Sequence, residues 1–273
     1  MSLGYCMQDG VSSLQSYSKG LEVIGNNISN VNTTGFKKAD AEYGDNFYNT
    51  LRSEGTNNQV GSGVNVKRVS TDYNTEDATY TGQENNLAIN GQGFFRVQSP
   101  SDGTVFYTRS GSFTKDSNGY LVTSEGYRLL GTNSLASPYL QVPSQATNPT
   151  TGAKEDISSW SFSSTTGELS LYFSDGSSTK AGQVQLSNFT NPQGLASQGG
   201  NLYKESATTG TRTDFSPAND AFATVKSQYL EKSNVDLTQE LSSMIVTQRA
   251  FQAGSRVITT SDQLMQEAIK LKS

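Results

Sequence analysis

The side chains that most often carry enzyme chemistry are scarce in this chain of 273 residues. It contains no histidine and one cysteine, Cys6, which excludes His-dependent catalytic triads, His-based metal sites and an intrachain disulfide. Carboxylate, lysine and Ser/Lys mechanisms remain open. Since no constellation of residues names a reaction, the sequence predicts a protein that is not an enzyme, with no catalytic residue, cofactor or metal site.

Acidic side chains near the amino-terminal region are the first candidates for cation binding. Glu22, Asp40, Glu42 and Asp45 form a small cluster along the sequence. They lack the alternating ligand spacing of a calcium loop, and a solvated acidic face is therefore the better interpretation.

Two glycine pairs resemble the beginnings of phosphate-binding loops, at Gly61-Ser62-Gly63 and Gly91-Gln92-Gly93. Neither completes a Walker pattern or opens a helix inside a βαβ unit, so we interpret both as turn glycines. The formal charge of -5 leaves no basic footprint for a phosphate backbone, and we expect no nucleic-acid partner.

The amino-terminal residues also bear on location. They lack the basic region and the continuous apolar region of a secretory signal, and no run of the sequence approaches the length of a membrane span. We therefore expect no membrane insertion, and either a cytoplasmic protein or one exported without a cleaved signal peptide.

Any site would be positioned first by two terminal helices. All prolines lie between Pro100 and Pro217, so both ends of the chain lack proline and can form long helices. From Met7 to Val31 apolar residues recur at spacings of three or four, which predicts an amphipathic helix. Its several glycines weaken it, so packing must stabilise it. The stretch Asn26–Gly35 is rich in residues that end helices, and we expect a glycine-containing junction there that permits adjustment.

A second helix is predicted near the carboxyl terminus. Ser233, Asn234 or Asp236 can cap it, and it should run to about Lys272. Its apolar residues recur mostly in steps of seven, as in a coiled-coil seam, although an ordinary amphipathic helix packed on its own domain fits them as well. Two such helices at opposite ends of one chain are natural partners for each other.

Between the helices lie stretches with a period of two, bounded by turn residues. They predict strands and hairpins at Val105–Arg109, Tyr120–Thr123, Tyr127–Leu130, Leu169–Phe173 and Gln183–Leu186. Residues 137–164, which contain three prolines, are predicted to be a loop-rich excursion. The predicted fold class is therefore α+β, with long terminal helices paired in a coiled-coil-like domain and a mainly β middle.

Several segments carry a resemblance to a known family. Leu21–Lys37 is similar to the amino-terminal signature of bacterial flagellar hook and rod proteins, the axial proteins of the basal body. Leu87–Phe95 and Tyr107–Phe113 resemble the central β segment of that family, and Ser233–Thr238 and Met244–Arg249 resemble its carboxy-terminal part. The sequence is most similar to a compact hook protein, while its length also suits a rod subunit.

The resemblance implies a structural subunit of the flagellar hook that polymerises into a hollow helical tube and transmits torque from motor to filament. The implied partners are further copies of the chain, the rod, hook-cap and hook–filament junction proteins, and the flagellar type III export apparatus. The implied location is the extracellular hook or the periplasm-spanning rod. A distal or proximal rod subunit is the main alternative, and a β-rich adhesin with a helical stalk or a muramidase would be the alternatives outside the family.

These considerations divide the chain and its candidate residues. Residues 1–32 and 236–273 form the expected helical tube core, 33–72 and 200–235 the connecting segments, and 73–199 the β-rich outer domain. The expected assembly residues are Leu14, Leu21, Ile24, Ile28, Leu237, Leu241, Met244, Ile245, Phe251, Ile258 and Met265. The expected junction loop contains Asn27, Asn30, Asn32, Gly35 and Phe36.

Overall fold

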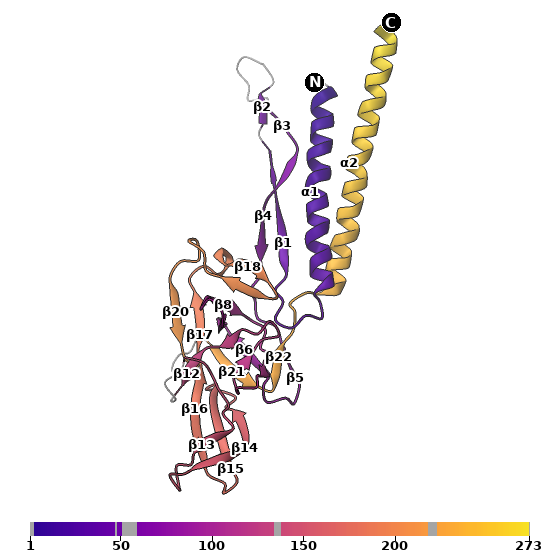
Figure 1. Ribbon diagram of the computed structural model, residues 1–273. Coiled ribbons are helices and arrows are strands. Elements are labelled where there is room, and N and C mark those ends of the chain that lie inside the picture. Colours follow the sequence, from indigo (N-terminus) through magenta and orange to yellow (C-terminus); the bar gives the residue numbers. More distant parts are fainter. Residues whose placement is uncertain (1–2, 47, 51–58, 134–137, 218–222, 273) are drawn as a thin grey trace. The chain divides into compact units, whose positions relative to one another are not determined.

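A computed structural model describes residues 3–46, 48–50, 59–133, 138–217 and 223–272 (Figure 1). The chain forms two compact units. The helical unit consists of Met1–Val31, Lys37–Asp72 and Val235–Ser273, and the β unit of Asn32–Phe36 and Tyr73–Asn234. The two terminal helices and the mainly β middle confirm the predicted α+β class.

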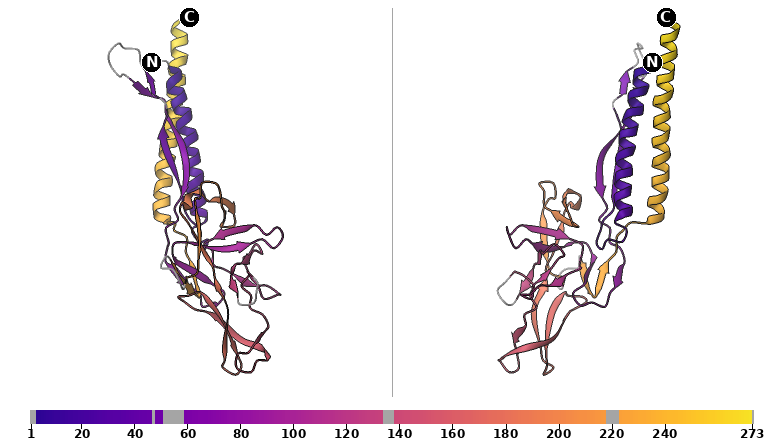
Figure 2. Two further views of the ribbon diagram at one scale, coloured as in Figure 1. Left: turned by 90° about the vertical axis from the view of Figure 1, so that its left-hand side faces the viewer. Right: turned by 45° about the vertical axis from the view of Figure 1, so that its right-hand side comes forward.

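The helical unit is built on α1 (Leu3–Ser29) and α2 (Leu237–Lys272), which run antiparallel and side by side (Figures 1 and 2). Their register is fixed at both ends. Ile258 lies against Gly10, and the Asn27 amide Nδ2 donates a hydrogen bond of 3.2 Å to Glu240 Oε2. The two helices predicted from the sequence thus pack against each other.

Helix α2 begins where its cap was expected. The carboxylate Oδ1 of Asp236 accepts hydrogen bonds from the backbone N–H groups of Thr238 at 2.8 Å and Gln239 at 3.2 Å. These donors would otherwise have no partner in the first turn, and the negative charge also suits the positive end of the helix dipole.

A hairpin lies along α1 within the helical unit. Strand β1 (Ala39–Asp45) pairs antiparallel with β4 (Val64–Thr71), and the shorter β2 (Tyr48–Thr50) pairs with β3 (Gln59–Gly61). The Asn27 side chain both donates to the carbonyl of Ala39 and accepts from its N–H, and it thereby fastens β1 to the helix. This hairpin lies within residues 33–72, which the sequence predicts to be a connecting segment.

The β unit contains two larger sheets among its described residues, all of whose strand pairs are antiparallel. The nine-stranded sheet has the order β18 (Ala196–Gly199), β19 (Leu202–Lys204), β8 (Val105–Thr108), β7 (Phe94–Gln98), β11 (Arg128–Leu129), β10 (Leu121–Val122) and β9 (Thr114–Lys115), and β17 (Leu186–Phe189) pairs with β7 and with β20 (Arg212–Phe215). The five-stranded sheet has the order β12 (Gly131–Asn133), β16 (Ser178–Val184), β15 (Glu168–Phe173), β14 (Lys154–Phe162) and β13 (Gln145–Thr147).

Two pairs of strands and a short helix complete the β unit. Strand β6 (Leu87–Gly91) pairs with β21 (Ala223–Ser227), β5 (Ala78–Tyr80) pairs with β22 (Tyr229–Glu231), and the 3-10 helix η1 spans Pro192–Gly194. All the predicted strands overlap observed strands, but Gln183–Leu186 is divided between β16 and β17.

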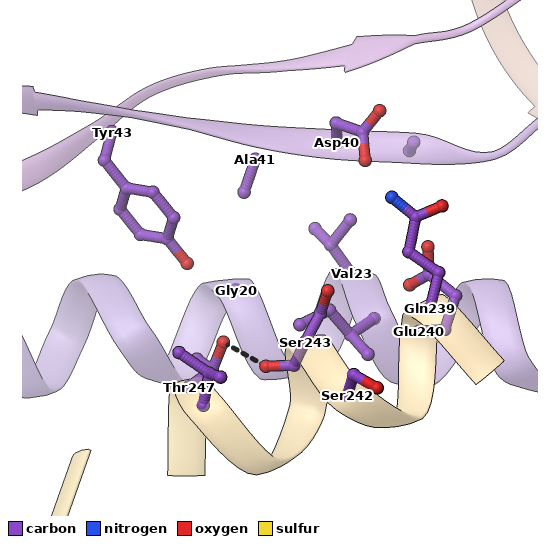
Figure 3. A pocket seen from close by; sticks show the side chains of 13 residues that line it. Gly20, Val23, Asp40, Ala41, Tyr43, Gln239, Glu240, Ser242, Ser243 and Thr247 are labelled. Carbon is purple, nitrogen blue, oxygen red and sulfur yellow. Dashed lines mark hydrogen bonds between the residues drawn. The ribbon is translucent and has the colours of Figure 1, made fainter. Parts of the chain in front are cut away.

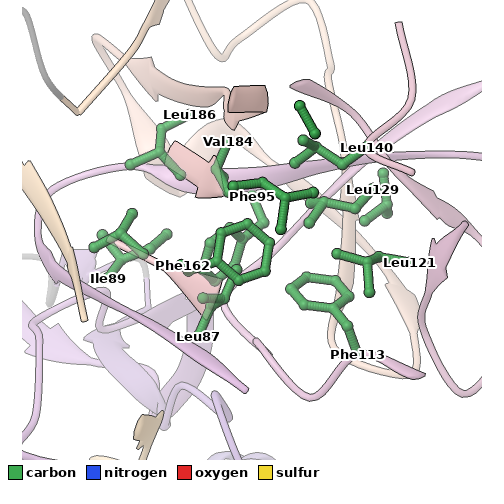
Figure 4. Packing of buried hydrophobic residues seen from close by; sticks show 14 of the residues in the cluster. Leu87, Ile89, Phe95, Phe113, Leu121, Leu129, Leu140, Phe162, Val184 and Leu186 are labelled. Atoms are coloured by element: carbon green, nitrogen blue, oxygen red, sulfur yellow. The ribbon is translucent and has the colours of Figure 1, made fainter. Parts of the chain in front are cut away.

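The core of the β unit follows from the alternation of side chains along its strands. On β7, Phe95 enters the main cluster of buried residues, whereas its neighbour Phe94 enters a second, aromatic cluster on the opposite face. Phe95 meets Phe113 edge to face with ring centroids 5.5 Å apart, surrounded by leucines such as Leu121 and Leu129 (Figure 4). One strand therefore supports two packed layers.

The prediction of a loop-rich excursion over residues 137–164 is wrong in its last part. Strand β14 forms the centre of a β13–β14–β15 ladder, and its nine residues include only Ile157, Trp160 and Phe162 as large apolar side chains. The register shifts between Ile157 and Ser159, which breaks the period of two that identifies a strand in a sequence. The polar sequence and this bulge together hide the strand.

Candidate assembly surface

The predicted assembly residues divide into half-buried and exposed side chains. On α1, the four predicted residues Leu14, Leu21, Ile24 and Ile28 are half-buried. On α2, Met244, Ile258 and Met265 are half-buried, whereas Leu237, Leu241, Ile245 and Phe251 are exposed. Contacts between the helices include Ile258 against Gly10 and Leu14 against Gly254, and the exposed residues lie on the surface of α2.

Helix α2 carries a further apolar row that lies outside the predicted set of assembly residues. Val246, Val257, Leu264 and Leu271 are all exposed, with Leu271 at 89%. Steps of eleven and seven residues bring side chains back to nearly the same direction on a helix of 3.6 residues per turn. We call these four residues the outer row of α2. All four side chains thus leave apolar surface exposed along one side of α2.

A hollow of about 430 Å³ opens between the two helices and β1 (Figure 3). Val23 and Val246 supply apolar surface, and Ser242 and Ser243 supply hydroxyl groups. The ring of Tyr43 extends from β1 toward Gly20, where a glycine leaves room for its hydroxyl. Neither lysine nor arginine lines the hollow.

Acidic and basic side chains lie next to each other on the hairpin of the helical unit. Glu42 accepts two hydrogen bonds of 2.8 Å from the Arg68 guanidinium, and these bonds lower the pKa of the Glu42 carboxyl. Lys38 lies 3.6 Å from Asp40, and Lys67 lies 3.9 Å from Asp45. Three of the four clustered acidic residues thus face basic partners. Burial and the neighbouring Tyr17 raise the pKa of Tyr43.

Within the described ranges there is no group of three or more His, Cys, Asp or Glu side chains placed to hold a metal ion. Over the same ranges, neither helix is long and apolar enough to cross a membrane.

The predicted junction residues fall on both units. Asn27 is buried in the last turns of α1, where it joins β1 and α2, and the Asn30 side chain bonds to Asn26. Asn32, Gly35 and Phe36 belong to the β unit. The structure therefore does not bring the five residues together in one loop.

Sequence reasoning missed the buried ion pair of Arg109 and Glu231 in the β unit. The side chains are 2% and 0% exposed, and their closest charged atoms are 3.4 Å apart. Burial lowers the pKa of the Arg109 guanidinium, whereas the nearby Glu231 opposes that shift. The one signal in the sequence was a charged residue directly after the apolar strand Val105–Thr108.

The class of protein that this fold and surface define is a structural protein, built around paired terminal helices with an uncovered apolar face. Three family models match the chain: "Flagella basal body rod protein" over residues 7–37, "Flagellar hook protein FlgE/F/G D1 domain" over 88–158, and "Flagellar basal body rod FlgEFG protein C-terminal" over 226–271. They cover both helices and the central strands.

Whole-length relatives agree with the family models. The flagellar basal-body rod protein FlgG of Bacillus subtilis is 38% identical over 97% of this chain and 98% of that protein. The rod protein FlgG of Borreliella burgdorferi is 35% identical over 96% of each chain. The flagellar hook protein FlgE of Escherichia coli is 24% identical over 96% of this chain and 98% of that protein. The chain belongs to the family of flagellar hook and basal-body rod proteins.

Proposed function

We propose that the chain is a subunit of the flagellar rod, and that it polymerises with its own copies into the tube of the basal body. The supporting observation is how the relatives align. The Bacillus subtilis rod protein aligns over 276 positions, close to the length of this chain, whereas the Escherichia coli hook protein needs 405 positions at lower identity. The alternative of the sequence analysis is therefore better supported than its main interpretation, a hook subunit.

The proposal gives each unit a role. The helical unit supplies the wall of the tube, and the β unit supplies its outer surface. The sequence assigns the same two roles to residues 1–32 with 236–273 and to residues 73–199. The partners are further copies, neighbouring axial proteins and the flagellar type III export apparatus, and the location is the periplasm-spanning rod. The role is structural and needs no catalytic residue, cofactor or metal.

The outer row of α2 is the proposed contact between copies. Burying a valine or leucine side chain contributes about 1.5–3 kcal/mol. A tube grows through heterologous contacts that repeat without closing, and a loss at one contact therefore recurs at every added subunit. Substitutions that spare the helix pair should then block growth of the tube while the subunit stays folded.

The test uses a double variant, Val257→Ser with Leu264→Ser, and the control Tyr172→Ser, which alters an exposed side chain of the β unit. We expect the double variant to keep its circular dichroism spectrum, to form no tubes at high concentration by negative-stain electron microscopy, and to fail to restore motility to a deletion strain. The control should assemble and restore motility. Tubes of normal diameter from the double variant would contradict the assembly surface.

A separate experiment decides between rod and hook. Deletion of the gene should leave basal bodies whose rod is incomplete, as seen in purified basal bodies by electron microscopy. Complete rods that lack a hook would instead make the chain a hook subunit.

A further inference from the structure

The short segment between α1 and β1 is held by the β unit. We call this segment, Asn32–Phe36, the strap. It belongs to the β unit, whereas the residues on both sides of it belong to the helical unit. Such a segment, rich in asparagine, threonine and glycine, is expected from the sequence to be an adjustable junction. Its contacts show something different.

Two hydrogen bonds attach the strap to distant parts of the β unit. The backbone N–H of Gly35 donates to the carbonyl of Glu231 on β22 at 2.9 Å. The side-chain Nδ2 of Asn201, between β18 and β19, donates to the carbonyl of Thr34 at 3.0 Å. Asn201 is held at φ 57°, a left-handed conformation that asparagine tolerates better than most residues.

Gly35 also lies against the backbone directly after β8. Its φ is 69°, and a Cβ atom there would lie 2.5 Å from the Ser110 nitrogen and 2.7 Å from the Arg109 carbonyl carbon. Backbone atoms cannot move aside as the end of a side chain can. The strap therefore reaches this position only with glycine at residue 35.

Arg109 and Glu231, whose backbones contact Gly35, are joined to each other through their side chains. The Arg109 guanidinium contacts the Glu231 carboxylate at 3.4 Å and donates to the carbonyl of Gly91 at 2.9 Å. It also lies over the ring of Phe94, 5.3 Å from the centroid. Gly35 thus rests on the backbone of one member of a buried ion pair and bonds to the backbone of the other.

We infer that the strap is a clamped connection, locked onto the β unit by Gly35, Asn201 and the Arg109–Glu231 pair, and that it does not act as a hinge. The contacts that support this inference all lie within the β unit, and none of them depends on the proposed function. For a rod subunit, a clamped strap would make the chain leave the β unit at a fixed point under torque, and this consequence alone rests on the proposed function.

Hydrogen exchange of the Gly35 amide in the purified full chain tests the inference, because that N–H is the donor to Glu231. We expect exchange at least about 100-fold slower than in an unstructured peptide, which corresponds to an opening free energy of about 2.8 kcal/mol. Exchange at the rate of the unstructured peptide would overturn the inference.

Gly35→Ala and Gly152→Ala form a matched pair. Both glycines have nearly the same φ, 69° and 70°, but nothing lies within 4 Å of a Cβ at Gly152. The backbone strain of alanine is therefore similar, and only the variant at 35 collides with the β unit. We expect the amide of residue 35 to lose most of its protection in Gly35→Ala and to keep it in Gly152→Ala. Equal protection in the two variants would contradict the clamp.

A third variant covers the case in which Gly35→Ala fails to fold. Asn201→Gly keeps the left-handed backbone and removes only the hydrogen bond to Thr34. We expect exchange at Gly35 to become about 5–10-fold faster, as the loss of a single hydrogen bond implies, and unchanged exchange would count against the clamp. Since the assay needs no assembly, its outcome is independent of whether the chain serves in rod or hook.

Discussion

Replacing Gly10 with alanine should leave the helix pair unchanged or weaken it, whereas the same replacement at Gly25 should strengthen it. Both glycines lie inside α1, where alanine is favoured by about 1 kcal/mol because it restricts the unfolded backbone. A Cβ at Gly10 would lie 2.6 Å from Cγ1 of Ile258 on α2, but at Gly25 no atom lies within 4 Å. The two variants therefore differ in one contact between the helices.

The magnitude follows from these distances. Carbon atoms pack best about 3.5–4.0 Å apart, so α2 must shift away from Gly10→Ala. Such overpacking costs about 1–3 kcal/mol, which cancels or exceeds the gain in helix propensity. We expect Gly25→Ala to stabilise the helical unit by about 1 kcal/mol, and Gly10→Ala to leave it unchanged or destabilise it by up to about 2 kcal/mol.

Thermal unfolding followed by circular dichroism at the helical band measures the difference. For a unit of roughly 100 residues, 1 kcal/mol moves Tm by about 4–8 °C, so Gly25→Ala should melt at least about 4 °C above Gly10→Ala. Adding Ile258→Ala to Gly10→Ala removes the colliding atoms, and the double variant should be more stable than the sum of the single changes predicts. Equal stabilisation by alanine at both glycines would show that α2 does not approach α1 at Gly10.

Two further predictions concern the β unit. Arg109→Met and Glu231→Leu should each lower the free energy of unfolding by about 3–5 kcal/mol, because each leaves a buried charge unpaired. The double variant should lose much less stability, as urea titrations would show. Additive losses would refute the pairing. Burial, with a smaller effect from Glu205, raises the pKa of Tyr107 to about 12, whereas an unfolded tyrosine titrates near 10. The unfolded chain therefore loses this proton first, and stability should fall between pH 10 and 12. The fall should be smaller in Tyr107→Phe, as urea midpoints at pH 9 and pH 11 would show, and an equal fall would contradict the assignment.

The parts of the fold that were predicted depend on contacts close in sequence. The helices follow from apolar spacing and from the cap at Asp236, and the strand pair β15 and β16 follows from the turn between them. The β1–β4 hairpin was not expected, because its strands are largely exposed and polar. Its attachment depends on Asn27, whose bond to Glu240 joins residues 213 positions apart.

Local sequence patterns are also insufficient to predict the candidate assembly surface. A stripe in steps of seven predicts that α2 packs against another helix, but it does not say which side meets α1. The outer row, with Val246 and Leu271, is exposed. The junction was expected to be adjustable because its residues favour turns. It is held by hydrogen bonds to Glu231 and Asn201, and Glu231 pairs with Arg109, 122 positions away, which no local pattern reveals.

The antiparallel pairing of α1 and α2 has a consequence for how the family diversifies. Ile258 lies against Gly10, so the beginning and the end of the chain meet at the same end of the helix pair (Figure 2). Everything between the helices is then, in topological terms, one large insertion whose length is free to change without altering their register. The Escherichia coli hook protein aligns with 96% of this chain over 405 positions. In this topology, a change in the length of the middle region leaves the pairing of α1 with α2 intact.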